Sequence, residues 1–130
     1  MKVKFYLATA GLIVSQHFIA QTNKMEDVHL TMDCASSDNT VNKATLEKCA
    51  KFTLVGTDKE KYEIVSSIVS FNRNKTINEF NCSGNEMSKE CKSAFLKSVS
   101  GETIYVENTR IKRKSDGIVK TLPTLTLIVK

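Results

Sequence analysis

The order of signals in the last third of the chain constrains the fold more than any other feature of the sequence. A segment with helical spacing, residues 86–99, ends just before Gly101, and alternating apolar residues follow it. The Asp116-Gly117 pair is a typical signal for a tight hairpin turn, and Pro123 interrupts the strand after it. This order predicts a helix with a glycine C-cap and then a long hairpin. Its second strand should be kinked or lie at an edge, because proline cannot donate to a ladder.

The helical segment has one apolar side, which we interpret as a core-facing stripe. Asn85 is expected to cap its first turn, and Glu86 places negative charge near the positive end of the helix dipole. The residues of the stripe recur at helical spacing and are Met87, Cys91, Ala94, Phe95 and Ser98.

The first half of the chain has the pattern of short strands. Residues 62–71 are rich in β-branched side chains and predict a strand. Ser66 and Ser67 stand side by side and break its alternation, which predicts a β-bulge. Residues 76–80 are expected to pair back onto this strand. Further short strands are expected over residues 28–32 and 52–56.

The N-terminus has the pattern of an export signal. Lys2 and Lys4 flank the start of an apolar run over residues 5–14. Ser15 ends that run before it reaches the roughly 20 residues that a membrane-spanning helix needs. We therefore expect residues 1–20 to be a cleaved signal peptide and the protein to be exported, periplasmic or secreted, with no membrane span after cleavage. An uncleaved N-terminal anchor is the alternative.

All four cysteines follow the predicted signal. An even number of cysteines in a small exported domain is typical of disulfides, and four cysteines allow three connectivities. We favour the local pairs Cys34–Cys49 and Cys82–Cys91, each of which would stabilise the fold by about 3 kcal/mol. A zinc site is the alternative, but the pairs lack the short spacing of zinc ligands. The sequence thus predicts a single disulfide-tied, β-sandwich-like domain over residues 21–130, mainly β with one α-helix.

Catalytic patterns are weak in this sequence. The one cluster that resembles a reactive site is His29 with Asp33 and Cys34, because a thiol nucleophile needs a nearby base and an orienting group. We favour the alternative, a surface histidine near an oxidised cysteine. The 5 glycines are scattered and form no phosphate-binding loop. We expect a protein that is not an enzyme and needs no cofactor or metal.

The formal net charge of +5 is carried mostly by scattered lysines, and residues 110–114 form the one tight basic run. Aromatic residues hardly interleave with basic ones, so nucleic-acid binding is not expected. A solvated cluster that protects a hairpin edge is the simplest interpretation. As a protein-interaction surface on an edge or face of the last hairpin, we predict Arg110, Ile111, Lys112 and Arg113.

Three stretches carry a family resemblance: Asn85-Glu86-Met87-Ser88-Lys89-Glu90, Ser100-Gly101-Glu102-Thr103-Ile104-Tyr105-Val106-Glu107-Asn108 and Ser115-Asp116-Gly117-Ile118-Val119-Lys120-Thr121-Leu122-Pro123. Through them, residues 71–130 resemble the C-terminal domain of the gliding-motility protein GldM, a periplasmic component of type IX secretion in Bacteroidetes. In that family a proline usually precedes the Asp-Gly pair, where this chain has Ser115. The resemblance implies a β-rich, sandwich-like domain with a helix that is used for protein contacts, and it brings no catalytic residues.

The expected function is therefore that of a non-enzymatic, exported protein-interaction domain. The resemblance adds an association with type IX secretion or gliding. The alternative is a small secreted inhibitor of a foreign hydrolase, similar to lysozyme inhibitors. In that case the polar segment 36–42 would be the loop that enters the active site.

Overall fold

The computed structural model describes residues 26–49 and 51–130. The predicted signal peptide lies outside these residues. The described part contains one α-helix, α2 (Lys89–Leu96), and two short 3-10 helices, η2 (Lys43–Lys48) and η3 (Lys59–Lys61). Its strands are β1 (His29–Met32), β2 (Thr40–Val41), β3 (Phe52–Val55), β4 (Tyr62–Arg73), β5 (Thr76–Ser83), β6 (Thr103–Arg113), β7 (Val119–Leu122) and β8 (Leu125–Val129).

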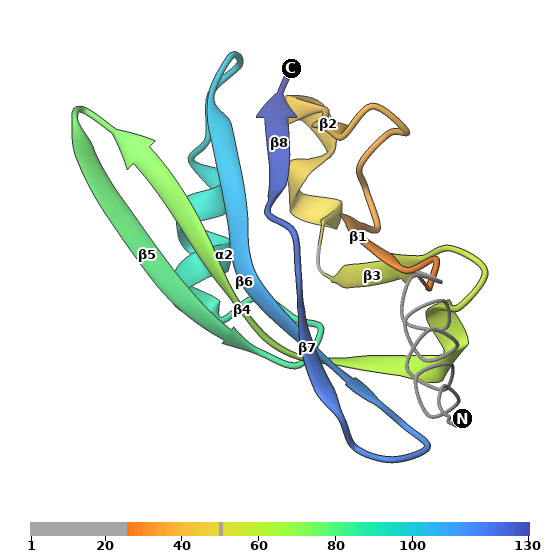
Figure 1. The fold of residues 1–130 in the computed structure, drawn as a ribbon. Helices are drawn as coiled ribbons and strands as arrows, with labels where there is room; N and C mark the ends of the chain where they lie inside the picture. The colour runs from red at the N-terminus through yellow and green to blue at the C-terminus, as the bar shows by residue number, and fades with distance from the viewer. Residues whose placement is uncertain (1–25, 50) are drawn as a thin grey trace, which may run out of the picture.

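The strands form two sheets. The larger one has the order β2-β8-β6-β4-β5, with β7 also paired to β6, and the smaller one is the antiparallel pair β1-β3. Figure 1 shows the long strands β4, β5 and β6 bending across the molecule, with α2 beside β5 and the small sheet on the side of β8. The prediction of a mainly β domain with one helix and a disulfide is confirmed.

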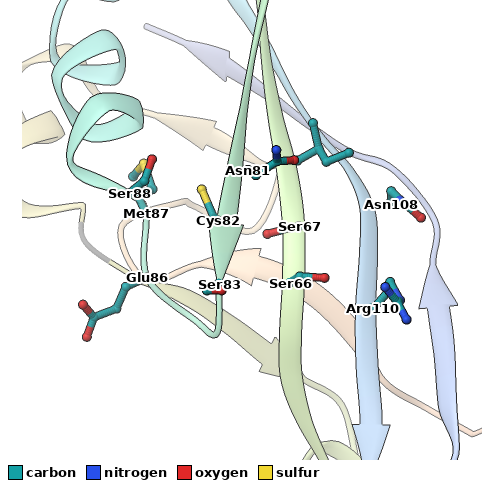
Figure 2. A pocket seen from close by; sticks show the side chains of 11 residues that line it. Ser66, Ser67, Asn81, Cys82, Ser83, Glu86, Met87, Ser88, Asn108 and Arg110 are labelled. Carbon is teal, nitrogen blue, oxygen red and sulfur yellow. The ribbon is translucent and has the colours of Figure 1, made fainter.

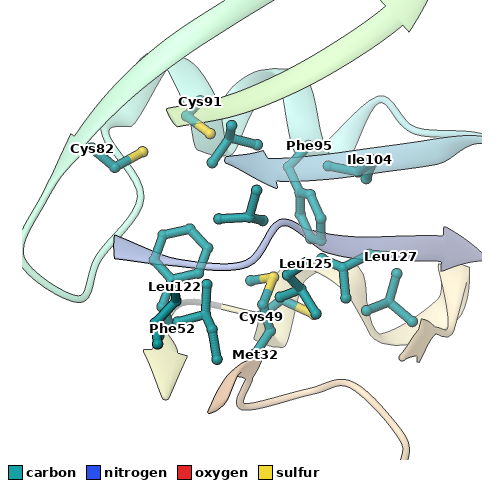
Figure 3. Packing of buried hydrophobic residues seen from close by; sticks show 14 of the residues in the cluster. Met32, Cys49, Phe52, Cys82, Cys91, Phe95, Ile104, Leu122, Leu125 and Leu127 are labelled. Atoms are coloured by element: carbon teal, nitrogen blue, oxygen red, sulfur yellow. The ribbon is translucent and has the colours of Figure 1, made fainter. Parts of the chain in front are cut away.

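Side chains from both sheets and from α2 share one core. Phe52 of β3, Phe71 of β4 and Phe95 of α2 are each at most 2 % exposed. Figure 3 shows Phe95 of α2, Leu127 of β8 and Met32 of β1 within one cluster of buried side chains. Because neither sheet covers its own apolar face, the two depend on one another for burial.

The predicted bulge lies in β4. The register of β4 against β6 shifts on both sides of Ser66, so the bulge expected from the adjacent serines is confirmed. At its other end β4 turns into β5 through Asn74 and Lys75, whose φ angles are 53° and 63°. Two successive residues with positive φ between paired strands form a type I′ turn, which matches the twist of a hairpin.

The helix is shorter than the sequence pattern predicted. Its N-cap is Ser88, whose Oγ accepts a hydrogen bond of 3.2 Å from the Cys91 N–H. Asn85 was expected in that role, but its carbonyl accepts from the Phe52 N–H at 2.7 Å and joins β3 to the loop. At the C-terminal side the cap is Lys97, so the predicted C-cap at Gly101 is wrong. Gly101 lies farther along the loop with φ +93°, a conformation that favours glycine.

The final hairpin has the predicted turn, but its first strand, β6, lies inside the sheet and not at its edge. Gly117 has φ 75°, and Pro123 lies between β7 and β8, where it divides the return strand in two. Strand β6 pairs with β4 on one side and with β7 and β8 on the other. The predicted hairpin edge at residues 110–113 is therefore an interior strand, and only its faces are available to a partner.

Candidate functional site

The first predicted disulfide is present. Cys34 follows β1, Cys49 ends η2, and their sulfurs are bonded with the two Cα atoms 5.2 Å apart. This bond closes the segment that contains the polar residues 36–42 and the short strand β2. The pairing expected from local spacing is confirmed for these two cysteines.

The second predicted disulfide is not formed in the structure. Cys82 and Cys91 are free thiols, 2 % and 0 % exposed. Cys82 lies on β5, opposite Ser67 of β4, and Cys91 lies in the first turn of α2. The prediction placed both in a disulfide from their spacing alone, whereas the fold brings them together as a dithiol.

Hydrogen bonds distinguish the two thiols. Cys82 accepts from the Cys91 thiol, and the Ser88 N–H and hydroxyl add two weaker hydrogen bonds. These interactions outweigh the effect of burial and lower the pKa of Cys82 to about 6. The pKa of Cys91 is raised, because its proton is held by the Cys82 sulfur and because it is buried. This arrangement gives one thiolate at a helix N-terminus and one protonated partner.

A cavity of about 560 Å³ opens beside Cys82 (Figure 2). The Cys82 sulfur is directed toward the start of α2, and the Ser67 hydroxyl extends from β4 toward the β5 side. The Ser67 Oγ is buried and has no hydrogen-bond partner among the described residues. The bulge in β4 positions the Ser67 hydroxyl, because Ser67 lies within the irregular stretch next to Ser66. Polar residues that complete the lining include Asn81, Glu86, Asn108 and Arg110.

The predicted interaction surface is only partly a surface. Arg110 is exposed, and it has no ion-pair partner within residues 26–49 and 51–130. Lys112 is half-buried and pairs with Glu63 at 3.3 Å. Ile111, in contrast, is 0 % exposed and belongs to the core. Alternation along a strand explains this result, because neighbouring side chains point to opposite faces of the sheet.

Arg113 contacts other side chains of the chain. Its guanidinium contacts Asp116 at 3.0 Å and Glu26 at 3.6 Å, and it stands 5.9 Å from the centre of the Tyr62 ring. Lys120 covers the same ring at 4.8 Å. The cluster fixes the hairpin end against the start of β4, so Arg113 is engaged within the chain.

The thiol–histidine site considered for His29 is not assembled. The imidazole Nε2 lies 2.9 Å from the Asp27 carboxylate, and the histidine side chain is 69 % exposed. Cys34, its nearest cysteine in sequence, is oxidised. The favoured interpretation of a surface histidine near an oxidised cysteine is confirmed.

The outer edge of the large sheet is a second feature that sequence reasoning did not single out. In the described part of the chain β5 pairs only with β4, and six of its eight residues are exposed. Ile77, 64 % exposed, is the most exposed large apolar residue of the described chain. The sequence signal was present in the β-branched and aromatic content of residues 76–80, but its position at an edge is a matter of topology.

Comparison with known proteins places the chain in no family. No family model matches the sequence, and no curated protein matches it. Within the residues that the structure describes, no His, Cys, Asp and Glu side chains group to hold a metal ion. No helix in the same residues has the length and apolar character needed to cross a membrane.

Proposed function

We propose that this protein is a non-enzymatic, exported protein-interaction domain that binds an extended segment of a partner along β5. The observation that carries the proposal is the free edge of this eight-residue strand. An unpaired edge offers a row of N–H and C=O groups to which another strand can add.

The edge of β5 lacks most of the devices that usually protect such edges, and Glu79 is its one charged side chain. The opposite edge of the large sheet is β2, which has only two residues, and β7 is followed directly by Pro123. Strand β5 is longer, contains no proline or lysine, and exposes Ile77. Short strands, proline and lysine are the common means of preventing strand addition. Their absence from β5 supports a binding role.

The direction of the free backbone groups follows from the register. The type I′ turn makes Arg73 and Thr76 a hydrogen-bonded pair, and such pairs alternate along an antiparallel ladder. Ile77, Glu79 and Asn81 therefore direct their N–H and C=O groups away from β4. A partner strand would pair with these three residues.

The setting of the proposal rests on two further points. The Cys34–Cys49 disulfide is typical of proteins that leave the reducing cytosol. The resemblance of residues 71–130 to the GldM C-terminal domain points to type IX secretion or gliding components as the partners to test first.

A proline substitution tests the edge directly. Glu79→Pro removes one outward N–H and no hydrogen bond to β4, whereas Glu79→Ala makes the same side-chain deletion and keeps the N–H. We expect the alanine variant to capture the same proteins from a periplasmic extract as the native chain, and the proline variant to lose them. Equal capture by two variants of equal thermal stability would contradict strand addition at β5.

A second function, inhibition of a foreign hydrolase, is favoured by the polar loop after Cys34. The Ser36 hydroxyl hydrogen-bonds to Asp38 and Thr40, and Thr40 Oγ1 donates to Asp38 at 2.8 Å. The two hydroxyls lower the pKa of Asp38. A loop ordered before binding loses less entropy when it enters an active site. Inhibition of lysozyme that Asp38→Ala weakens and Glu79→Pro leaves intact would favour this function over the first.

A further inference from the structure

Beyond partner binding, we propose that Cys82 and Cys91 form a thiol–disulfide exchange site that accepts a small zwitterionic disulfide from the cavity beside β5. Cys82 is the attacking thiol and Cys91 the resolving thiol. The product is a disulfide that joins β5 to the first turn of α2.

The position of Cys82 supports its role as the nucleophile. Its sulfur meets the N-terminus of an eight-residue helix, where the Ser88 N–H and hydroxyl and the Cys91 thiol are hydrogen-bond donors to it. Helix N-termini and nearby donors stabilise a thiolate, which is the form that attacks disulfides. The Cys91 thiol is itself the donor to the Cys82 sulfur and is buried, so it keeps its proton until the second step.

The cavity gives this buried sulfur a route to a small reactant. Cys82 is 2 % exposed, so a folded protein disulfide cannot approach it, but it lines a polar cavity of about 560 Å³. Ligand pockets for small molecules begin at roughly 300 Å³. A reactant of the size of cystine or a small peptide disulfide is therefore the appropriate class.

The charges around the cavity define the chemical class further. Arg110, with no ion-pair partner in the described part of the chain, offers a guanidinium for a carboxylate. Glu86, in the loop before α2, also lines the cavity, and Figure 2 shows its carboxylate directed outward from Cys82, where it can meet an ammonium group at the rim. The buried Ser67 hydroxyl has no hydrogen-bond partner in the described chain and faces the same space, where it can donate to the departing sulfur. The two charged groups favour a disulfide that carries both an amine and a carboxylate.

The exchange balances in two steps. The Cys82 thiolate attacks one sulfur of the small disulfide, which breaks the S–S bond, releases one thiolate and leaves a mixed disulfide on Cys82. Cys91 then gives its proton to solvent, attacks the Cys82 sulfur and releases the second half of the reactant. The protein loses two electrons and two protons, and the small disulfide is reduced to two thiols.

Intact-mass analysis of the full chain treated with oxidised glutathione tests the proposal. The native chain should lose the mass of two hydrogens and carry no adduct. Cys91→Ala should retain one glutathionyl group on Cys82, and Cys82→Ala should retain none under native conditions. An adduct on Cys91 in the second variant, or no reaction of folded native chain and folded Cys91→Ala, would overturn the proposal.

Two further variants separate a built site from a merely accessible thiol. Arg110→Gln should slow adduct formation in the Cys91→Ala background by about tenfold, because the charge no longer attracts the carboxylate. Lys97→Gln removes an exposed charge on α2's C-terminal side and should leave the rate unchanged. Equal rates in both variants would contradict the binding role of the cavity. Neither result depends on partner binding at the β5 edge, so the two proposals can fail separately.

Discussion

The two cysteine pairs of this protein are both close in the sequence but differ in chemistry. Cys34 and Cys49 are bonded and tie a loop-rich region that contains a two-residue strand and a 3-10 helix. Cys82 and Cys91 remain thiols between a long strand and the α-helix, beside a polar cavity. The comparison indicates that the Cys34–Cys49 disulfide holds together a region with few regular backbone hydrogen bonds. Where a strand and a helix already define the geometry, the second pair is available for chemistry.

The largest expected effect is the loss of the first pair. Cys34→Ala with Cys49→Ala should lower the free energy of unfolding by about 3 kcal/mol, because the unfolded chain regains the entropy of an open loop. Urea unfolding followed by circular dichroism measures it. The matched control is Cys82→Ala with Cys91→Ala, compared under reducing conditions that leave the first disulfide intact. A smaller loss for the first pair than for the second would reverse the comparison.

Closure of the second pair should have the next largest effect. Oxidation of the native chain is expected to raise the free energy of unfolding by about 2–3 kcal/mol, because the loop it closes is shorter. Unfolding curves before and after treatment with oxidised glutathione give the difference. Cys91→Ala, treated in the same way, should show no such gain. A decrease on oxidation would mean that the bond distorts the junction between β5 and α2.

The Ser88 cap connects the helix to the thiol pair. Ser88→Ala should cost about 1 kcal/mol of stability, because the Cys91 N–H loses its acceptor. It should also raise the pKa of Cys82, since the Ser88 hydroxyl is one of its donors. Ser93→Ala, at an exposed position of the same helix, is the control. Unchanged stability and thiol reactivity in Ser88→Ala would contradict both roles of Ser88.

The smallest expected effect is the change of the Cys82 alkylation rate with pH. Its alkylation rate in the native chain should rise with pH through a midpoint near the lowered pKa of about 6 and level off at higher pH, because the thiolate is the reactive form. Cys91→Ala should move this rise to higher pH, since the Cys91 thiol is the largest cause of the lowering. Arg110 and Glu86 also line the cavity and carry opposite charges. Iodoacetamide labelling read by mass spectrometry gives the profile. The same midpoint in both proteins would contradict the hydrogen bond between the thiols.

Local chemistry explains which features were predictable. Gly101 and Gly117 mark positive φ angles that other residues adopt with strain, and Ser66-Ser67 marks the bulge. The helix cap was misplaced because Asn85 and Ser88 are both good caps in isolation. In the structure the helix begins at Lys89 with Ser88 as its cap, and the Asn85 backbone carbonyl accepts from the Phe52 N–H across the fold.

The sequence by itself indicated most of the strands, the turns, the presence of a single helix and the local Cys34–Cys49 pair, because these depend on side chains close in the chain. The tertiary structure decided that β6 is an interior strand, which buries Ile111 and leaves Arg110 at a cavity. It also decided that β5 is an edge and that Cys82 meets the start of α2 as a thiol. Strand order and the environment of a sulfur arise from contacts between distant segments, which spacing along one chain does not encode.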